Sequence, residues 1–158
     1  MMLPRYSMQL FPHAMRGGVL AFIVGDTICY YYCVTVSFLF SHLSCKLAQL
    51  TVTPLQLIRF FCLYRPPPSK KNRLTESAFF SEFGDFLEHC NLLGGKMLIF
   101  GDFNFHFDCP TNSACIMDML QTLHFFQVVK VPTHCCGHTL DLVVHRKSLS
   151  SLLIINLS

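Results

Sequence analysis

Residues 97–104 read Met-Leu-Ile-Phe-Gly-Asp-Phe-Asn, a short apolar run that enters Gly-Asp-x-Asn. An apolar run bounded by glycine is typical of a buried central strand, and the glycine allows the backbone to turn sharply. Asp102 and Asn104 lie two residues apart, so in extended backbone their side chains point the same way, off the end of the strand. Such a pair can hold a water molecule, a hard metal ion or a phosphate oxygen. The same residue types also form turns, so the tetrapeptide alone leaves a simple turn open.

Three other stretches accompany this motif. They are Gly-Gly-Val-Leu-Ala-Phe-Ile at 17–23, Cys-Leu-Tyr-Arg-Pro-Pro-Pro at 62–68 and Thr-Leu-Asp-Leu-Val-Val at 139–144. In this order the four stretches resemble the strands of the endonuclease/exonuclease/phosphatase family, and most closely the apurinic/apyrimidinic-endonuclease-like domain of LINE-type retrotransposon proteins. The resemblance implies an α/β fold, a two-sheet α/β sandwich of the endonuclease/exonuclease/phosphatase type. It covers residues 16–158 as a partial domain, after an N-terminal segment, 1–15, that we expect to be irregular.

The resemblance also implies a reaction, the Mg²⁺-dependent hydrolysis of a phosphodiester bond in DNA. Asp102 would bind the metal and would orient or deprotonate the attacking water. Asn104 would hydrogen-bond the phosphate or support the site. Tyr64 and its neighbour Arg65 would contact the phosphate. Asp141 would be the carboxylate that orients a catalytic histidine.

Two parts of the family pattern are not found. The family takes a metal-binding glutamate from an N-terminal segment, whereas the glutamates here are Glu76, Glu82 and Glu88, all within a helical pattern. The family also ends on Ser-Asp-His, and no aspartate in this chain is followed by histidine. We therefore expect a domain that is incomplete at both ends, a retrotransposon-derived fragment with little or no activity, in which Asp141 lacks its partner.

Composition and charge agree with one small domain. The chain has 158 residues, of which 52% are hydrophobic and 13% charged, against about 25% charged in an average soluble domain. A fragment that lacks part of its sheet would leave such apolar strands uncovered. The net charge of +3 permits nucleic-acid binding without arguing for it. The basic cluster 70–73 is either a solvated loop or the phosphate contact of a non-catalytic nucleic-acid-binding remnant.

The cysteines favour a reduced, intracellular protein. There are nine, without regular pairing and without a Cys-x-x-Cys motif. The stretch His134-Cys135-Cys136-x-His138 allows a zinc site, but adjacent cysteines rarely share one tetrahedral ion, and no second cluster in the sequence completes it. His106 and Asp108 follow the Gly-Asp-x-Asn motif, and we expect them in the adjoining loop without a catalytic role.

Residues 19–40 raise the alternative of a small membrane-anchored protein, because this apolar stretch carries one charge, Asp26. A charge near the middle of a span costs roughly 2.5–3.5 kcal/mol on insertion scales. The stretch is also rich in β-branched and aromatic residues, which favour strands. We expect two antiparallel strands, 17–24 and 28–40, that turn at Gly25-Asp26-Thr27 and pair with each other.

The remaining pattern alternates strands and helices. Strands are expected at 46–53, 57–64, 96–101, 126–131 and 139–145. Thr75 is a suitable N-cap for a helix to Leu93 with phenylalanines on one face, ended by Gly94-Gly95. Ser113 would cap a second helix over 114–125, with Ile116, Leu120 and Leu123 turned inward.

Overall fold

The computed structural model describes residues 6–12, 19–25, 30–34, 44–53, 56–70, 73–93 and 95–146. In chain order its elements are β1 (Tyr6–Pro12), β2 (Val19–Gly25), β3 (Tyr30–Val34), β4 (Ser44–Thr53), β5 (Gln56–Tyr64), α1 (Glu76–Leu93), β6 (Lys96–Asp102), α2 (Pro110–Thr122), β7 (Phe125–Gln127) and β8 (Asp141–Arg146).

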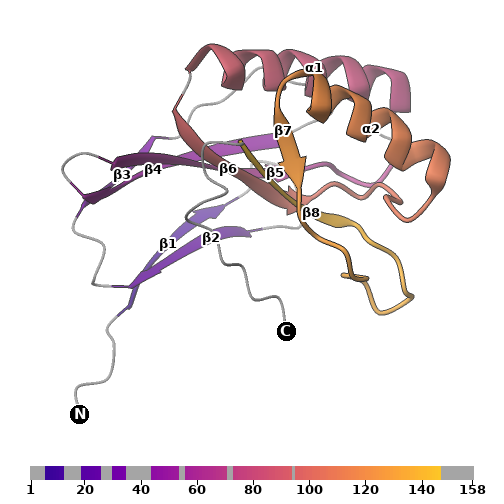
Figure 1. Ribbon diagram of the computed structural model, residues 1–158. Helices are drawn as coiled ribbons and strands as arrows, with labels where there is room; N and C mark the ends of the chain where they lie inside the picture. The colour runs from indigo at the N-terminus through magenta and orange to yellow at the C-terminus, as the bar shows by residue number, and fades with distance from the viewer. Residues whose placement is uncertain are drawn as a thin grey trace.

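The strands form two sheets. Within the described ranges, β1 pairs with β2 in one sheet, and the other strands form a six-stranded sheet in the order β3-β4-β5-β6-β8-β7. β5 and β6 are parallel, so the chain must cross over between them, and α1 lies in that crossover. Both helices lie over one face of the large sheet, and the β1–β2 pair lies on its other side (Figure 1). This is the two-sheet α/β arrangement that the sequence predicts.

The main core lies between the helices and the large sheet. Of the apolar positions expected on one face of α1, Phe80 is only partly buried and packs against the core, and the others are buried: Phe79, Phe83, Phe86, Leu87 and Cys90. From the sheet, Met97 and Ile99 of β6 are completely buried, whereas their strand neighbours Leu98 and Phe100 are only partly buried. Because side chains alternate along a strand, Leu98, Phe100 and Asp102 belong to the face directed away from the helices.

The ends of α1 follow the sequence signals. The Thr75 hydroxyl accepts a hydrogen bond from the Ala78 amide at 3.3 Å, which is the expected N-cap contact. After the last helical residue, Leu93, the backbone reaches Gly95 with φ 76°, a left-handed conformation that glycine adopts without strain.

Two expectations about the N-terminal part were wrong. Residues 6–12, within the segment expected to be irregular, form β1, which pairs with β2 from Tyr6↔Gly25 to Pro12↔Val19. The expected pairing of 17–24 with 28–40 is also wrong, because β3 pairs with β4 instead. Apolar patterning indicates that a segment is a strand but does not select its partner. The predicted turn at 25–27 extends beyond the described residues.

The start of the second helix also differs from the prediction. α2 begins at Pro110, not at residue 114, and Ser113 lies inside its first turn. Cys109 occupies the N-cap position in extended backbone, without a capping side-chain bond. Proline suits the first helical position because its φ is already helical and its missing N–H would have no partner there. Ile116 and Leu120 are buried as expected, and Leu123 packs against the core beyond the last helical residue.

The described parts of the segment 19–40 are the strands 19–25 and 30–34. None of the helices in the described ranges combines the length and the apolar character needed to cross a membrane.

Candidate functional site

The register of three neighbouring strands places Tyr64, Asp102 and Asp141 in one row. Tyr64 of β5 pairs with Asp102 of β6, which pairs with Asp141 of β8. Residues directly opposite in a sheet lie about 4.5–5.5 Å apart at Cα and point to the same face. The side chains that the sequence predicts at strand ends therefore meet at one end of the large sheet, on the face directed away from the helices.

Gly101 allows the backbone of β6 to come close enough to β5 for this row to form. Its φ is 148°, and a Cβ atom added there would lie 1.8 Å from the backbone oxygen of Leu63. Only glycine allows the two backbones to approach this closely. The Arg65 amide then donates to the Asp102 carbonyl at 2.9 Å, so the pairing continues past the glycine.

Asn104 fixes the Asp102 carboxylate. Its backbone amide donates to Asp102 Oδ1 at 2.9 Å, and its side-chain Nδ2 donates to Asp102 Oδ2 at 3.2 Å. The same Nδ2 also donates to the Arg65 carbonyl at 2.8 Å. Asn104 has φ 43°, a conformation that asparagine tolerates better than most residues. Because both amide hydrogens are used within the protein, the geometry favours the supporting role for Asn104 over donation to a phosphate.

Arg65 does not lie where a phosphate contact requires it. Its side chain is 1% exposed, on the helix side of the sheet, because it follows Tyr64 in an extended backbone and so points to the opposite face. Its Nη1 donates to the Asn104 carbonyl at 2.8 Å. The guanidinium carbon lies 4.7 Å from the centroid of Phe79 and 5.6 Å from that of Phe105. Arg65 therefore supports the loop after β6 from beneath.

The surroundings of Asp102 disfavour the ionised form of its carboxyl group. Burial raises the pKa of Asp102, and the facing Asp141 carboxylate raises it further. The two hydrogen bonds from Asn104 act in the opposite direction, as does the nearby His134. Two carboxylates that repel each other in a partly buried position are a donor set that a hard cation would stabilise.

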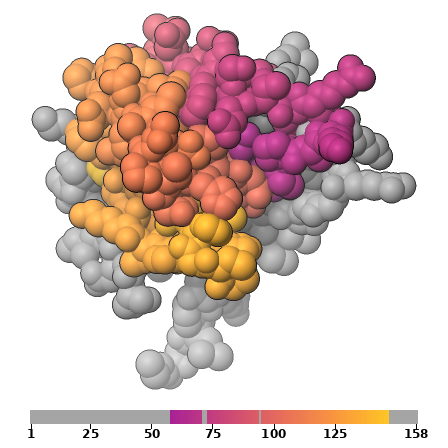
Figure 2. All heavy atoms as spheres, turned by 90° about the vertical axis from the view of Figure 1, so that its right-hand side faces the viewer, coloured from indigo at the N-terminus to yellow at the C-terminus, as the bar shows by residue number. Residues whose placement is uncertain are grey.

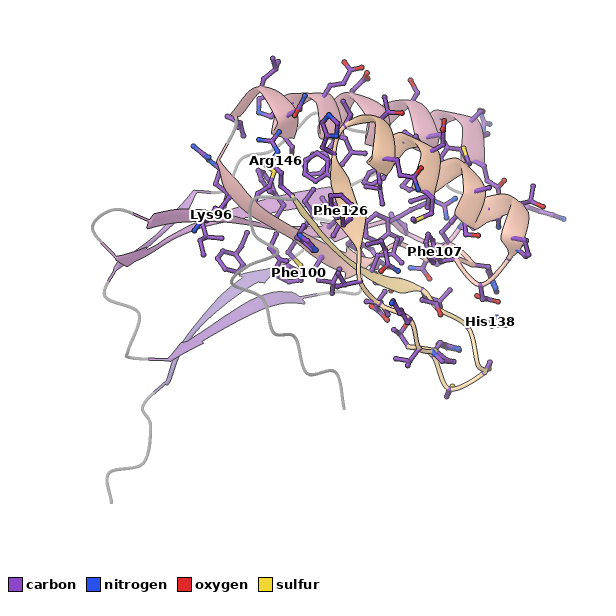
Figure 3. All side chains as sticks on the ribbon, in the orientation of Figure 1. Lys96, Phe100, Phe107, Phe126, His138 and Arg146 are labelled. Carbon is purple, nitrogen blue, oxygen red and sulfur yellow. The ribbon has the colours of Figure 1, made fainter. Side chains whose placement is uncertain are left out.

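The loop between β7 and β8 is tied to this end of the sheet. The Thr133 hydroxyl accepts hydrogen bonds from the amides of Leu140 and Asp141, both at 3.0 Å. The Thr139 amide donates to Asp108 Oδ1 at 3.1 Å, which links the loop to the segment after β6. Figure 2 shows the two segments as one continuous surface, and Figure 3 shows His138 on the outer side of the β7–β8 loop.

A cluster that the sequence analysis missed lies on this surface. His106, Asp108 and His138 offer three ligand atoms within 4.8 Å of one another. The spacing of His106 and Asp108, two apart after a strand end, was visible in the sequence. The arrival of His138 was not, because it depends on how a loop 30 residues away folds back.

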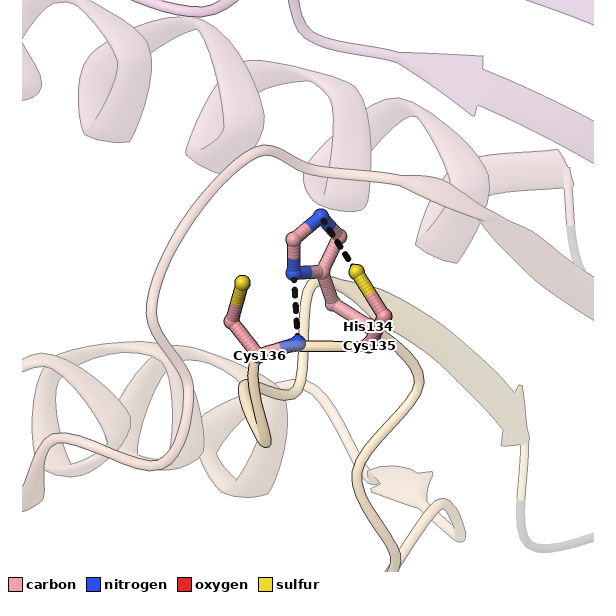
Figure 4. Close-up of side chains that lie close together, drawn as sticks. All are labelled: His134, Cys135 and Cys136. Atoms are coloured by element: carbon pink, nitrogen blue, oxygen red, sulfur yellow. Dashed lines mark hydrogen bonds between the residues drawn. The ribbon is translucent and has the colours of Figure 1, made fainter.

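A second group, His134, Cys135 and Cys136, also has its ligand atoms within 4.8 Å, and all three side chains are exposed (Figure 4). His134 Nδ1 accepts a hydrogen bond from the Cys136 amide at 3.2 Å, and Cys135 Sγ lies 3.9 Å from His134 Nε2. Because these residues are consecutive in the sequence, their proximity is weaker evidence for a metal site than the convergence of residues that are distant in the sequence.

Neither a protein-family model nor a curated protein matches the sequence. Solved structures do match. The human Nocturnin catalytic domain with a bound sulfate anion has a TM-score of 0.59 at 14% identity, and D. rerio TDP2 humanized by 14 mutations has 0.57 at 10%. An endonuclease/exonuclease/phosphatase family protein from Leptotrichia buccalis C-1013-b has 0.53 at 16%.

The alignments cover 90%, 89% and 90% of this chain and 61%, 60% and 61% of the matched chains, in the same order. The chain thus spans about three fifths of each structure it matches. At these identities the likeness concerns the fold. The chain has the two-sheet α/β sandwich fold of the endonuclease/exonuclease/phosphatase type.

Proposed function

We propose that residues 16–158 are part of a Mg²⁺-dependent endonuclease domain that cleaves phosphodiester bonds in DNA, and that this chain alone has little or no activity. The observation that carries the proposal is the row of Tyr64, Asp102 and Asp141 at one end of the sheet. The Nocturnin structure contains a bound sulfate, which is an oxyanion, as a phosphate group is. This supports the binding of an oxyanion by a protein with this fold. The order of the four motifs supports an origin in a LINE-type retrotransposon.

The residues of the row fit a hard cation. Asp102 would hold Mg²⁺ through a carboxylate that Asn104 already orients from two sides, and Asp141 would add negative charge beside it. The raised pKa of Asp102, caused first by burial and then by Asp141, marks the repulsion that a cation would relieve. When bound, the metal would supply positive charge that neutralises the negative charge developing on the phosphate and the leaving oxygen.

The chain's own groups would position the reactants. The Asp102 carboxylate would accept a hydrogen bond from the attacking water and so orient it. Tyr64, in the same row, would donate its phenol hydrogen to a phosphate oxygen. Asp141 would orient a catalytic histidine, but no aspartate in this sequence is directly followed by histidine, as the family's Ser-Asp-His motif requires. Because losing one member of a catalytic unit costs several orders of magnitude in rate, we expect weak activity.

The test is nicking of supercoiled plasmid DNA that contains abasic sites. We expect trace nicking by the full chain that requires Mg²⁺ and disappears in Asp102→Ala, while the Glu88→Ala variant, at an exposed position of α1, retains it. Robust nicking that Asp102→Ala abolishes would overturn the statement of low activity. Nicking that does not depend on Asp102 would overturn the assignment of the site.

A further inference from the structure

We propose that His106, Asp108 and His138 bind a divalent transition-metal ion of the Zn²⁺ class, at a site that does not include Asp102. The three residues come from two loops: His106 and Asp108 follow β6, and His138 lies between β7 and β8. Their ligand atoms all lie within 4.8 Å of one another. Convergence of side chains from separate parts of the chain is what a built site requires.

The spacing of the ligand atoms is close to that of a tetrahedral site. Asp108 Oδ2 lies 3.1 Å from His138 Nδ1. Two ligands with metal bonds of 2.0–2.1 Å at a tetrahedral angle lie about 3.3 Å apart. The rings of His106 and His138 meet edge to face, with centroids 4.2 Å apart and planes at 69°. Small side-chain rotations would bring His106 to the same ion.

The backbone around the cluster is already fixed. Asp108 Oδ1 accepts the Thr139 amide at 3.1 Å, which leaves Oδ2 directed towards His138. The Phe107 amide donates to the Thr139 carbonyl at 3.1 Å, and the Cys109 amide donates to the His106 carbonyl at 3.0 Å. Hydrogen bonds of this kind orient metal ligands and sharpen the affinity of a site. Both loops are therefore held in place by contacts that a bound ion would not disturb.

The donor set selects the class of ion. Imidazole nitrogens with one carboxylate suit Zn²⁺, Co²⁺, Ni²⁺ or Cu²⁺, whereas Mg²⁺ prefers oxygen ligands alone. The Asp108 and His138 side chains are 38% and 39% exposed, so an ion can enter from solvent with water as a further ligand.

The experiment must distinguish this site from a neighbouring group of possible metal ligands. His134, Cys135 and Cys136 could hold the same class of ion through thiolates. Co²⁺ distinguishes the two, because thiolate ligation gives an intense near-ultraviolet charge-transfer band that histidine and carboxylate ligation does not.

The experiment is titration of the metal-free full chain with Co²⁺ and then Zn²⁺, in the presence of excess Mg²⁺. We expect one Co²⁺ per chain, without a thiolate band, displaced by Zn²⁺ but not by Mg²⁺. His106→Gln should weaken Co²⁺ binding at least tenfold, and it leaves the Asp108–His138 hydrogen bond intact, so the fold should persist by circular dichroism. His138→Gln should weaken binding as strongly.

The matched control is the double variant Cys135→Ser, Cys136→Ser, which should bind Co²⁺ as the unmodified chain does. A thiolate band that this variant abolishes would move the site to the cysteines and overturn the proposal. Undiminished binding by both histidine variants would overturn it as well, and so would the absence of binding by the unmodified chain. None of these outcomes depends on nuclease activity, so they are distinguishable from failure of the proposed function.

Discussion

Asp102 and Asp141 face each other across β6 and β8, and their mutual repulsion can be measured directly. Replacing Asp141 by asparagine removes one of the two main causes that raise the pKa of Asp102, the other being burial. We expect Asp141→Asn to lower the pKa of Asp102, as followed by carbon NMR of the carboxyl group. An unchanged Asp102 titration would contradict the shared row.

The same change predicts how stability depends on pH. Because the pKa of Asp102 is higher in the folded than in the unfolded chain, its ionisation opposes folding above the folded pKa, and this penalty disappears as the pH falls below the unfolded pKa. Asp141→Asn reduces the penalty. The melting temperature of the variant, relative to the unmodified chain, should therefore rise as the pH increases through the titration of Asp102.

Arg65 provides a second prediction for a single residue. Lysine cannot reproduce a planar guanidinium that lies over the Phe79 ring while it donates to the Asn104 carbonyl. We expect Arg65→Lys to reduce the free energy of unfolding by about 2–3 kcal/mol, measured by urea denaturation. The exposed Arg73→Lys variant is the control and should change it by less than about 0.5 kcal/mol. Equal effects of the two substitutions would place Arg65 at the surface.

Residue-level prediction from the sequence succeeded where strand geometry alone decides the outcome. Tyr64 and Asp102 each end an apolar run, so their meeting at one sheet edge follows from the strands. Arg65 was misplaced because alternation along the strand directs it to the opposite face from Tyr64. His138 could not be placed near Asp108, because the conformation of a loop, not a periodic pattern, brings them together.

At the scale of the elements, alanine substitutions at Gly101 in β6 and Gly84 in α1 are expected to change the free energy of unfolding in opposite directions. Gly101→Ala forces a Cβ against the Leu63 backbone oxygen, which cannot move without separating β5 from β6. We expect a loss of about 4 kcal/mol or more in the free energy of unfolding. Gly84→Ala in α1 meets only the flexible end of Met119, at 3.3 Å, and should stabilise the helix by roughly 0.5–1 kcal/mol. The free energy of unfolding of both variants can be measured by thermal or urea denaturation. Changes of the same sign and size in the two variants would contradict this prediction.

The elements themselves were predictable to the extent that their signals are local. The Phe-rich face of α1 and the apolar runs of β5 and β6 each identify their element. The start of α2 was missed because Ser113 offers a capping hydroxyl, whereas the actual helix begins with the pre-organised φ of Pro110. The partner of β2 was missed because pairing is a property of the assembled sheet.

At the scale of the whole molecule, the reactivity of the cysteine thiols distinguishes those buried between layers of the fold from those exposed at the surface. Burial raises the pKa of Cys62 to about 11, so on the order of one thiol in a thousand is ionised at pH 8. Burial likewise raises the pKa of Cys90. We expect iodoacetamide at pH 8 to modify the exposed Cys115, Cys135 and Cys136 and to spare Cys62 and Cys90, as located by mass spectrometry. Rapid modification of Cys90 would contradict the packing of α1 on the sheet.

The proposed binding of a hard cation beside Asp102 and Asp141, at the end of the large sheet, can be tested with Mn²⁺ as a paramagnetic substitute for Mg²⁺. In the nitrogen-15-labelled full chain, Mn²⁺ should broaden the amide signals of Tyr64, Asp102 and Asp141, and excess Mg²⁺ should restore them. Asp102→Asn should remove the effect, and His106→Gln should leave it intact. Broadening that Mg²⁺ does not reverse, or that persists in Asp102→Asn, would contradict the account.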